Sequence, residues 1–159
     1  MHCNKLKTLP ELKKALNRIK AKKTTVVFTN GCFDLVHAGH INYLQKAKSL
    51  GDILVVGLNS DGSVRRLKGK KRPFAAQKNR AIVLSALACV DFIVIFDSLT
   101  PLDLIKAIKP DILVKGGDWK TKDIIGSGFV RSHGGRVKNL PYIKGFSTSK
   151  LIRKIKSLI

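Results

Sequence analysis

The chain has 159 residues, 44% of them hydrophobic, which suits one continuous core of ordinary domain size. No apolar run approaches the roughly 20 residues of a membrane-spanning helix, and no apolar stretch follows the basic N-terminus as it would in a signal peptide. These features exclude an integral membrane protein and predict one cytoplasmic domain over residues 1–159.

The chain is strongly basic, with 31 Lys and Arg against 10 Asp and Glu and a formal net charge of +21. Such a field attracts polyanions, so nucleic acids and phosphorylated metabolites are the partners to consider. Basic residues are densest at positions 65–72, a stretch that is either a solvated loop or an electrostatic funnel for anionic substrates. The few aromatic residues do not alternate with that stretch as in a stacking platform, which argues against nucleic-acid binding.

Short β-branched runs alternate along the chain with longer helical stretches. From the N-terminus, the pattern predicts a helix over residues 8–19 that begins with a capping box, a strand over 24–29, a loop over 30–36, a helix over 37–49 and a strand over 52–58. It then predicts a helix over 75–88, a strand over 91–96, and a helix that Thr100 caps and Pro101 starts and that ends before Pro110. Strands over 111–115 and 136–140 follow, and a final helix over 147–158 begins at Ser147.

Strands and helices in this order form right-handed βαβ units, so we expect an α/β fold with a single doubly wound parallel sheet. Ligands of such sheets bind beyond the carboxyl ends of the strands. That rule selects four candidate site loops, at residues 30–40, 59–72, 116–120 and 140–149.

The strongest local signal is the segment over residues 29–40, TNGCFDLVHAGH, which follows the first strand and opens the next helix. His37 and His40 are three residues apart, so on a helix they share a face. A helix N-terminus adds backbone N–H groups and partial positive charge, and Gly39 leaves room for a close approach. The segment therefore predicts a site for phosphate oxygens, although the chain has neither a P-loop nor a G-x-G-x-x-G fingerprint.

Metal and nucleophile chemistry find less support. The three cysteines are far apart, which predicts neither a disulfide framework nor a zinc-binding pair. The other histidines, His2 and His133, lack metal-ligand spacing. Cys32 has no acyl-transfer constellation around it. We therefore predict no metal site built by protein ligands alone.

The segment over residues 31–40 resembles the G-x-F-D-x-x-H-x-G-H signature of the cytidylyltransferase-like branch of the H-x-G-H nucleotidyltransferase superfamily. Residues 111–119 resemble the branch's nucleotide-contacting segment, and residues 145–149 resemble its G-x-S-T-[ST] motif. The resemblance covers nearly the whole chain and implies a Rossmann-like fold of the HUP type.

Within the branch, the chain is most similar to the adenylyltransferase domain of the bifunctional heptose kinase/adenylyltransferase family. Residues 59–61, 66–69, 72–73, 80 and 114–118 carry this narrower similarity. It implies that ATP and D-glycero-β-D-manno-heptose 1-phosphate give ADP-heptose and pyrophosphate with Mg²⁺, for lipopolysaccharide core synthesis. Since no kinase half is present in the sequence, we expect a stand-alone transferase that depends on a separate kinase.

The resemblance also implies residue roles. It assigns catalysis to His37, His40 and Lys68, and substrate binding to Asp34 and Arg72. It assigns nucleotide binding to Thr29, Asn30, Gly31, Cys32, Phe33, Gly39, Arg80, Gly116, Asp118, Ser147 and Thr148. Mg²⁺ would bridge phosphates and be held mostly by the nucleotide. Lys115 stays outside the catalytic set because it could face solvent, and Trp119 could cover hydrophobic surface or touch ligand.

Other functions stay open from the sequence. A CTP-dependent cytidylyltransferase for glycerol 3-phosphate or a related alcohol phosphate is one, although the Arg that this subgroup carries before its I-S-T-T is missing here. An FMN adenylyltransferase is another, and a basic nucleic-acid-binding module is the non-enzymatic alternative. The expected partners are ATP and a phosphorylated sugar, with a homo-oligomer also possible.

Overall fold

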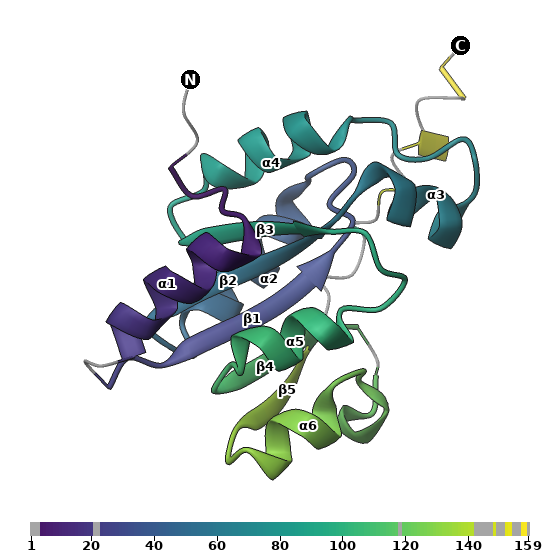
Figure 1. Cartoon of the computed structure of the whole chain (residues 1–159). Coiled ribbons are helices and arrows are strands. Elements are labelled where there is room, and N and C mark those ends of the chain that lie inside the picture. The colour runs from purple at the N-terminus through teal and green to yellow at the C-terminus, as the bar shows by residue number, and fades with distance from the viewer. Residues whose placement is uncertain are drawn as a thin grey trace.

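A computed structural model describes residues 4–20, 23–117, 119–141, 148, 152–153 and 157–158 of the chain. Five parallel strands form one sheet in the order β3-β2-β1-β4-β5 (Figure 1). They are β1 (Val26–Gly31), β2 (Ile53–Asn59), β3 (Phe92–Phe96), β4 (Ile112–Gly116) and β5 (Arg136–Leu140). The strand order reverses direction at β1, which confirms the predicted α/β class with a doubly wound parallel sheet.

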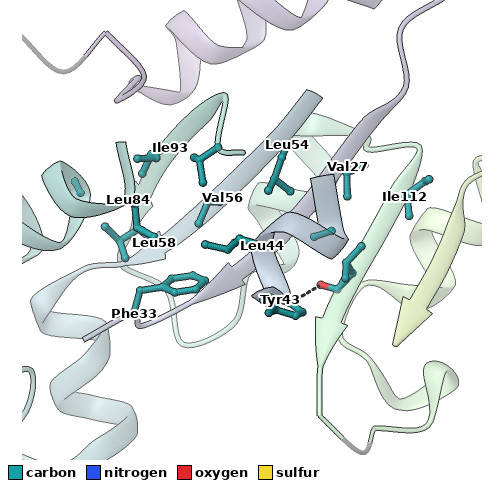
Figure 2. Packing of buried hydrophobic residues seen from close by; sticks show 14 residues of the cluster. Val27, Phe33, Tyr43, Leu44, Leu54, Val56, Leu58, Leu84, Ile93 and Ile112 are labelled. Carbon is teal, nitrogen blue, oxygen red and sulfur yellow. Dashed lines mark hydrogen bonds between the residues drawn. The ribbon is translucent and has the colours of Figure 1, made fainter. Parts of the chain in front are cut away.

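Helices cover both faces of the sheet (Figure 1). One face carries α1 (Leu9–Lys20), α5 (Leu102–Ile108) and α6 (Ser127–Ser132), and the other carries α2 (Ala38–Lys48) and α4 (Gln77–Ser85). Because successive strand residues point to opposite faces, the core divides in two. Phe28 and Leu113 pack toward α1 and α5, whereas Val27 and Val114 pack toward α2 and α4, the side drawn in Figure 2.

Several helix boundaries differ from the expected ones. The capping box is confirmed, because Glu11 Oε2 accepts a hydrogen bond of 2.8 Å from Thr8 N. Helix α2 begins one residue later than expected, with His37 as its N-cap, and α4 is shorter at both ends than the predicted 75–88. Helix α5 has Pro101 rather than Thr100 as its N-cap. The predicted final helix begins in residues that the structure does not describe.

Two connections that the sequence did not mark as helical contain helices. The basic loop expected after β2 includes α3 (Asp61–Lys68), whose N-cap Ser60 accepts a hydrogen bond of 2.9 Å from Ser63 N. The β4–β5 connection holds a short 3₁₀ helix, η1 (Thr121–Asp123), and then α6. None of the helices within the described ranges combines the length and apolar character that crossing a membrane requires.

Core packing of α4 gives a test of the fold. Leu84 is fully buried, whereas Ile82 on the same helix is 47% exposed. Leu84→Ala should lower the free energy of unfolding by about 2–5 kcal/mol, because it removes buried methyl groups and leaves a cavity. Ile82→Ala should cost under about 1 kcal/mol, as surface changes do. Urea unfolding of both variants measures the difference, and equal losses would contradict this packing of α4.

Candidate active site

A cavity of about 490 Å³ opens at the carboxyl end of the sheet. Loops and strand ends from β1, β2 and β4 meet there with the end of α3. This is the edge that the sequence pattern selected. Of the predicted site residues, the structure brings together Asn30, Gly31, Cys32, Phe33, Asp34, His40, Lys68, Arg72, Gly116 and Thr148. Asp118 and Ser147 lie outside the described residues.

The two motif histidines stand together at the start of α2. Their rings stack with centroids 3.9 Å apart and planes 27° apart. The His37 carbonyl accepts from His40 N at 2.8 Å, so the N-cap backbone fixes the spacing of the pair. Phe33 closes the other side of His40, with ring centroids 5.3 Å apart. The predicted shared face is therefore present, and Gly39 is buried between the two.

Burial disfavours the charged form of both imidazoles. Burial lowers the pKa of His37. Burial, then the neighbouring His37 and the Lys68 ammonium, lower the pKa of His40 to about 4. His40 Nδ1 is buried and has no hydrogen-bond partner in the described part of the chain. Neutral rings donate hydrogen bonds without carrying a proton for transfer, which suits contact with phosphate oxygens more than acid catalysis at neutral pH.

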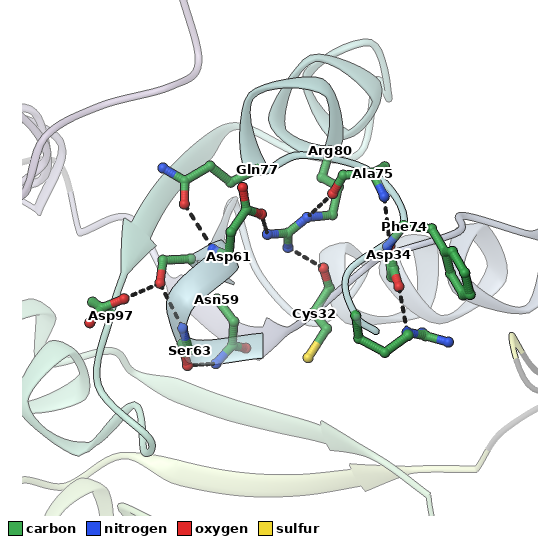
Figure 3. Close-up of polar contacts among 12 residues, drawn as sticks. Cys32, Asp34, Asn59, Asp61, Ser63, Phe74, Ala75, Gln77, Arg80 and Asp97 are labelled. Atoms are coloured by element: carbon green, nitrogen blue, oxygen red, sulfur yellow. Dashed lines mark hydrogen bonds and ion pairs between the residues drawn. The ribbon is translucent and has the colours of Figure 1, made fainter. Parts of the chain in front are cut away.

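Arg80 holds the base of the site and does not line the cavity (Figure 3). The residue is 1% exposed, and its guanidinium donates to Ala75 O at 2.9 Å, Cys32 O at 2.5 Å and Asp61 Oδ1 at 2.8 Å. A buried charge of this kind needs all of its partners. The expected nucleotide contact is therefore replaced by a structural one, which ties the loop after β1 to the start of α3.

Asp34 also differs from its expected role. Its Oδ1 accepts from Phe74 N at 2.8 Å and Ala75 N at 3.1 Å, and its Oδ2 lies 2.7 Å from Arg72 Nε. The Arg72 guanidinium carbon lies 4.8 Å above the centre of the Phe74 ring. The Asp34 carboxylate thus pairs with Arg72 and accepts from two backbone N–H groups, and both Asp34 and Arg72 line the cavity.

Two other residues of the motif, Thr29 and Gly31, are constrained by contacts within the protein. Thr29, expected to bind nucleotide, is fully buried, and its Oγ1 lies 2.6 Å from Tyr43 Oη, which joins β1 to α2. Gly31 is required by space, since a Cβ there would come within 2.9 Å of the Phe33 ring. These contacts shape the loop on which the cavity-lining residues sit.

Lys115 is a charged residue of the cavity wall that the sequence did not place in the catalytic set. It is half-buried at the carboxyl end of β4, and its Nζ lies 3.3 Å from Asn30 Oδ1. Burial, and secondarily the positive charge of Lys68, lower the pKa of Lys115. Its position at a strand end on the edge that binds ligands was the signal available. Trp119, which is 53% exposed, lines the cavity nearby.

The described residues do not build a metal site of their own. No group of three or more His, Cys, Asp or Glu among them could hold a metal ion. Asp34, which lines the cavity, is committed to Arg72 and two backbone N–H groups. A Mg²⁺ ion would therefore have to be held mostly by the phosphates of a bound nucleotide.

The electrostatic coupling of His40 to Lys68 can be tested by NMR titration. The pKa of His40 should be about 4, below the ordinary value of roughly 6.5. Lys68→Met should raise the pKa of His40. Lys71→Met, which removes an equal charge from the loop after α3, should leave that pKa unchanged. As the pH falls, His40 binds its proton in the unfolded state before it does so in the folded state. The contribution of His40 should therefore decrease the free energy of unfolding as the pH falls from about 6.5 to 4. A wild-type value near 6.5 would contradict the geometry.

Comparison with known proteins places this site in a family. The cytidylyltransferase-like family matches residues 28–154. The bifunctional protein HldE of Citrifermentans bemidjiense is 53% identical over 154 residues, which cover 97% of this chain and 32% of that protein. The bifunctional protein HldE of Helicobacter pylori strain G27 is 54% identical over 150 residues, which cover 94% and 31%. The chain thus spans about a third of the length of these curated relatives.

Solved structures agree. The lipopolysaccharide core biosynthesis protein from Thermoplasma volcanium is 32% identical, with a TM-score of 0.63 over 77% of this chain and 99% of that one. Pantoate-beta-alanine ligase from Francisella tularensis shares the fold, with a TM-score of 0.64 at 13% identity over 95% of this chain and 76% of that one. Because the family match spans most of the sequence and includes the histidine pair, the chain belongs to the cytidylyltransferase-like family.

Proposed function

We propose that this chain transfers the adenylyl group of ATP to D-glycero-β-D-manno-heptose 1-phosphate, giving ADP-heptose and pyrophosphate for lipopolysaccharide core synthesis. The observation that carries the proposal is the stacked pair of histidines at the N-terminus of α2, of which His40 lines the same cavity as Lys68 and Arg72. The choice of acceptor is supported by the 53% identity to a bifunctional protein HldE and by the similarity to heptose adenylyltransferase domains.

The reaction needs no covalent intermediate with the protein. An oxygen of the acceptor phosphate, already ionised at neutral pH, attacks the α-phosphorus of ATP in line. A lone pair of the attacking oxygen becomes the new P–O bond, and the electron pair of the broken P–O bond leaves on the pyrophosphate oxygen. The protein must therefore supply positioning and positive charge rather than a general base.

Each side chain has a defined part in that task. His37 and His40 donate hydrogen bonds to the triphosphate, beside the free N–H groups of the first turn of α2. Lys68, at the exposed end of α3, reaches across the cavity mouth to the phosphates. Arg72, fixed by Asp34, adds a second cation. Gly116 and Thr148 line the same cavity, and the family resemblance assigns Asp118 and Ser147 to the nucleotide as well.

Mg²⁺ enters this proposal with the nucleotide. When bound, it neutralises phosphate charge and orients the triphosphate. The surrounding lysines also neutralise phosphate charge, because they place fixed positive charge around the transferred group. The cytoplasmic location and a homo-oligomeric state stay predictions of the sequence.

Substrate choice is tested by pyrophosphate release from the purified protein with Mg²⁺. ATP and CTP are each paired with heptose 1-phosphate, glycerol 3-phosphate and FMN. We expect release from ATP with heptose 1-phosphate, since the cavity belongs to a chain that resembles heptose adenylyltransferases. Release from CTP with glycerol 3-phosphate, or from ATP with FMN, would keep the mechanism and replace the acceptor. A folded protein that is inactive with every pair would contradict the proposal.

The histidine pair is tested by His37→Ala and His40→Ala. Each variant should lose turnover by roughly 100–1,000-fold, the usual effect of removing one donor from a charge-stabilising site. His133→Ala is the matched control, because His133 is exposed at the end of α6 and should leave turnover unchanged. Circular dichroism checks that the fold is retained. Near-wild-type turnover in either motif variant would rule out this mechanism.

A further inference from the structure

Asn30 and Lys115 lie on the face of the sheet opposite to the histidines. Phe28 pairs with Leu113 in the β1–β4 register, and both pack toward α1 and α5. Two residues further along, Asn30 and Lys115 therefore point to that same face, and their contact of 3.3 Å agrees with it. His40 and Tyr43 approach the cavity from α2, on the other face. The cavity thus straddles the sheet edge and has two chemically distinct halves.

The Lys115 ammonium is short of an anionic partner. Among the described residues, no carboxylate oxygen lies within the 4.0 Å of an ion pair, and the side-chain oxygen of Asn30 is its one hydrogen-bond acceptor. Burial lowers the pKa of Lys115 most, the nearby Cys32 side chain raises it, and the charge of Lys68 lowers it. A half-buried cation with a neutral partner and a like charge nearby gains stability when an anion arrives.

The surroundings of Lys115 are apolar. A smaller cavity of about 110 Å³ adjoins the main one and shares Asn30, Lys115, Pro101, Trp119 and Ile125 with it. Leu113 and Ile124 add to its apolar wall, and Asp123, an exposed acidic residue, also lines it. This volume is well below the roughly 300 Å³ of a pocket for a whole ligand. It suits the carbon skeleton of a compact molecule more than a nucleotide.

We propose that Lys115, oriented by Asn30, binds the phosphate of the acceptor, and that the apolar wall around Trp119 receives the acceptor's sugar ring. The inference rests on the proposed function and assigns its second substrate to a subsite. The nucleotide triphosphate occupies the half with the histidines, and the acceptor phosphate approaches from the opposite face. Lys68 lines the same cavity as His40 and Lys115, and its charge lowers the pKa of both. Two anions brought from opposite sides give the in-line geometry that the transfer needs.

The chain contains a single tryptophan, so Trp119 reports on this subsite directly. Tryptophan fluorescence of the full chain is titrated with heptose 1-phosphate, with and without a non-hydrolysable ATP analogue. Calorimetry measures the affinity for the same analogue. Lys115→Met should weaken acceptor binding at least tenfold and change the affinity for the ATP analogue less than threefold. Lys138→Met, which removes an exposed charge on the neighbouring strand β5, should change neither.

Steady-state kinetics and stability separate binding from a structural role. Lys115→Met should raise KM for the acceptor with little change in KM for ATP. Its urea midpoint should equal or exceed that of the wild type, because a partly buried cation without a carboxylate partner is removed. A clear fall in stability would indicate a structural lysine and overturn the inference. So would a loss of affinity for the ATP analogue with acceptor binding unchanged.

Failure of the inference is distinguishable from failure of the proposed function. Glycerol 3-phosphate and inorganic phosphate are titrated in parallel with the heptose phosphate. If glycerol 3-phosphate binds with dependence on Lys115 while heptose 1-phosphate does not, the subsite is supported and the proposed acceptor is wrong. If heptose 1-phosphate binds and reacts equally well in Lys115→Met, the proposed function is supported and the subsite is wrong.

Discussion

The buried guanidinium of Arg80 is the contact on which the geometry of this site depends. It joins three segments that are far apart in sequence: Cys32 in the loop after β1, Asp61 at the start of α3, and Ala75 before α4. A charge this deeply buried is tolerated because each of the three guanidinium nitrogens donates a hydrogen bond to an oxygen. The same contacts set where the loop after β1 turns toward α2 and where α3 begins. The positions of His40 and Lys68 both follow from that choice.

Around this anchor, the cavity wall gathers the positive charges of Lys68, Arg72 and Lys115, and Asp34 pairs with Arg72. Lys68 lowers the pKa of both His40 and Lys115, so the cavity is electrostatically unfavourable for cations and favourable for phosphates. Arg72 is held at the rim by Asp34, whose carboxylate is consumed in the process. Burial is the main cause that lowers the pKa of both histidines, and at His40 the neighbouring His37 and the charge of Lys68 lower it further. Charge in this protein is thus arranged for ligands of high negative charge.

The hydrophobic pattern predicted the strands of the sheet and the helices α1, α2, α4 and α5. It did not predict the short helices α3, η1 and α6. Strands β1, β2 and β4 were recognisable because their apolar, β-branched runs are mostly buried. Helix α3 was missed because a basic run with Gly62 has little intrinsic helix preference. It forms because Ser60 caps it and because Ser63 binds Asn59 Nδ2 at 2.9 Å and Ser98 O at 2.8 Å. Those partners come from β2 and from the loop after β3, which no local window of sequence contains.

The sequence by itself determined the α/β class and the spacing of the histidine pair, and it marked the segment that we propose binds phosphate, because each depends on spacing within a few residues. Tertiary structure alone decided what Arg80, Thr29 and Asp34 do, since their partners lie in other segments and turn expected ligand contacts into internal ones. It also brought Lys115 beside Asn30, at the ends of two neighbouring strands. Strand register places such side chains together in space, and register arises only when the whole sheet has formed.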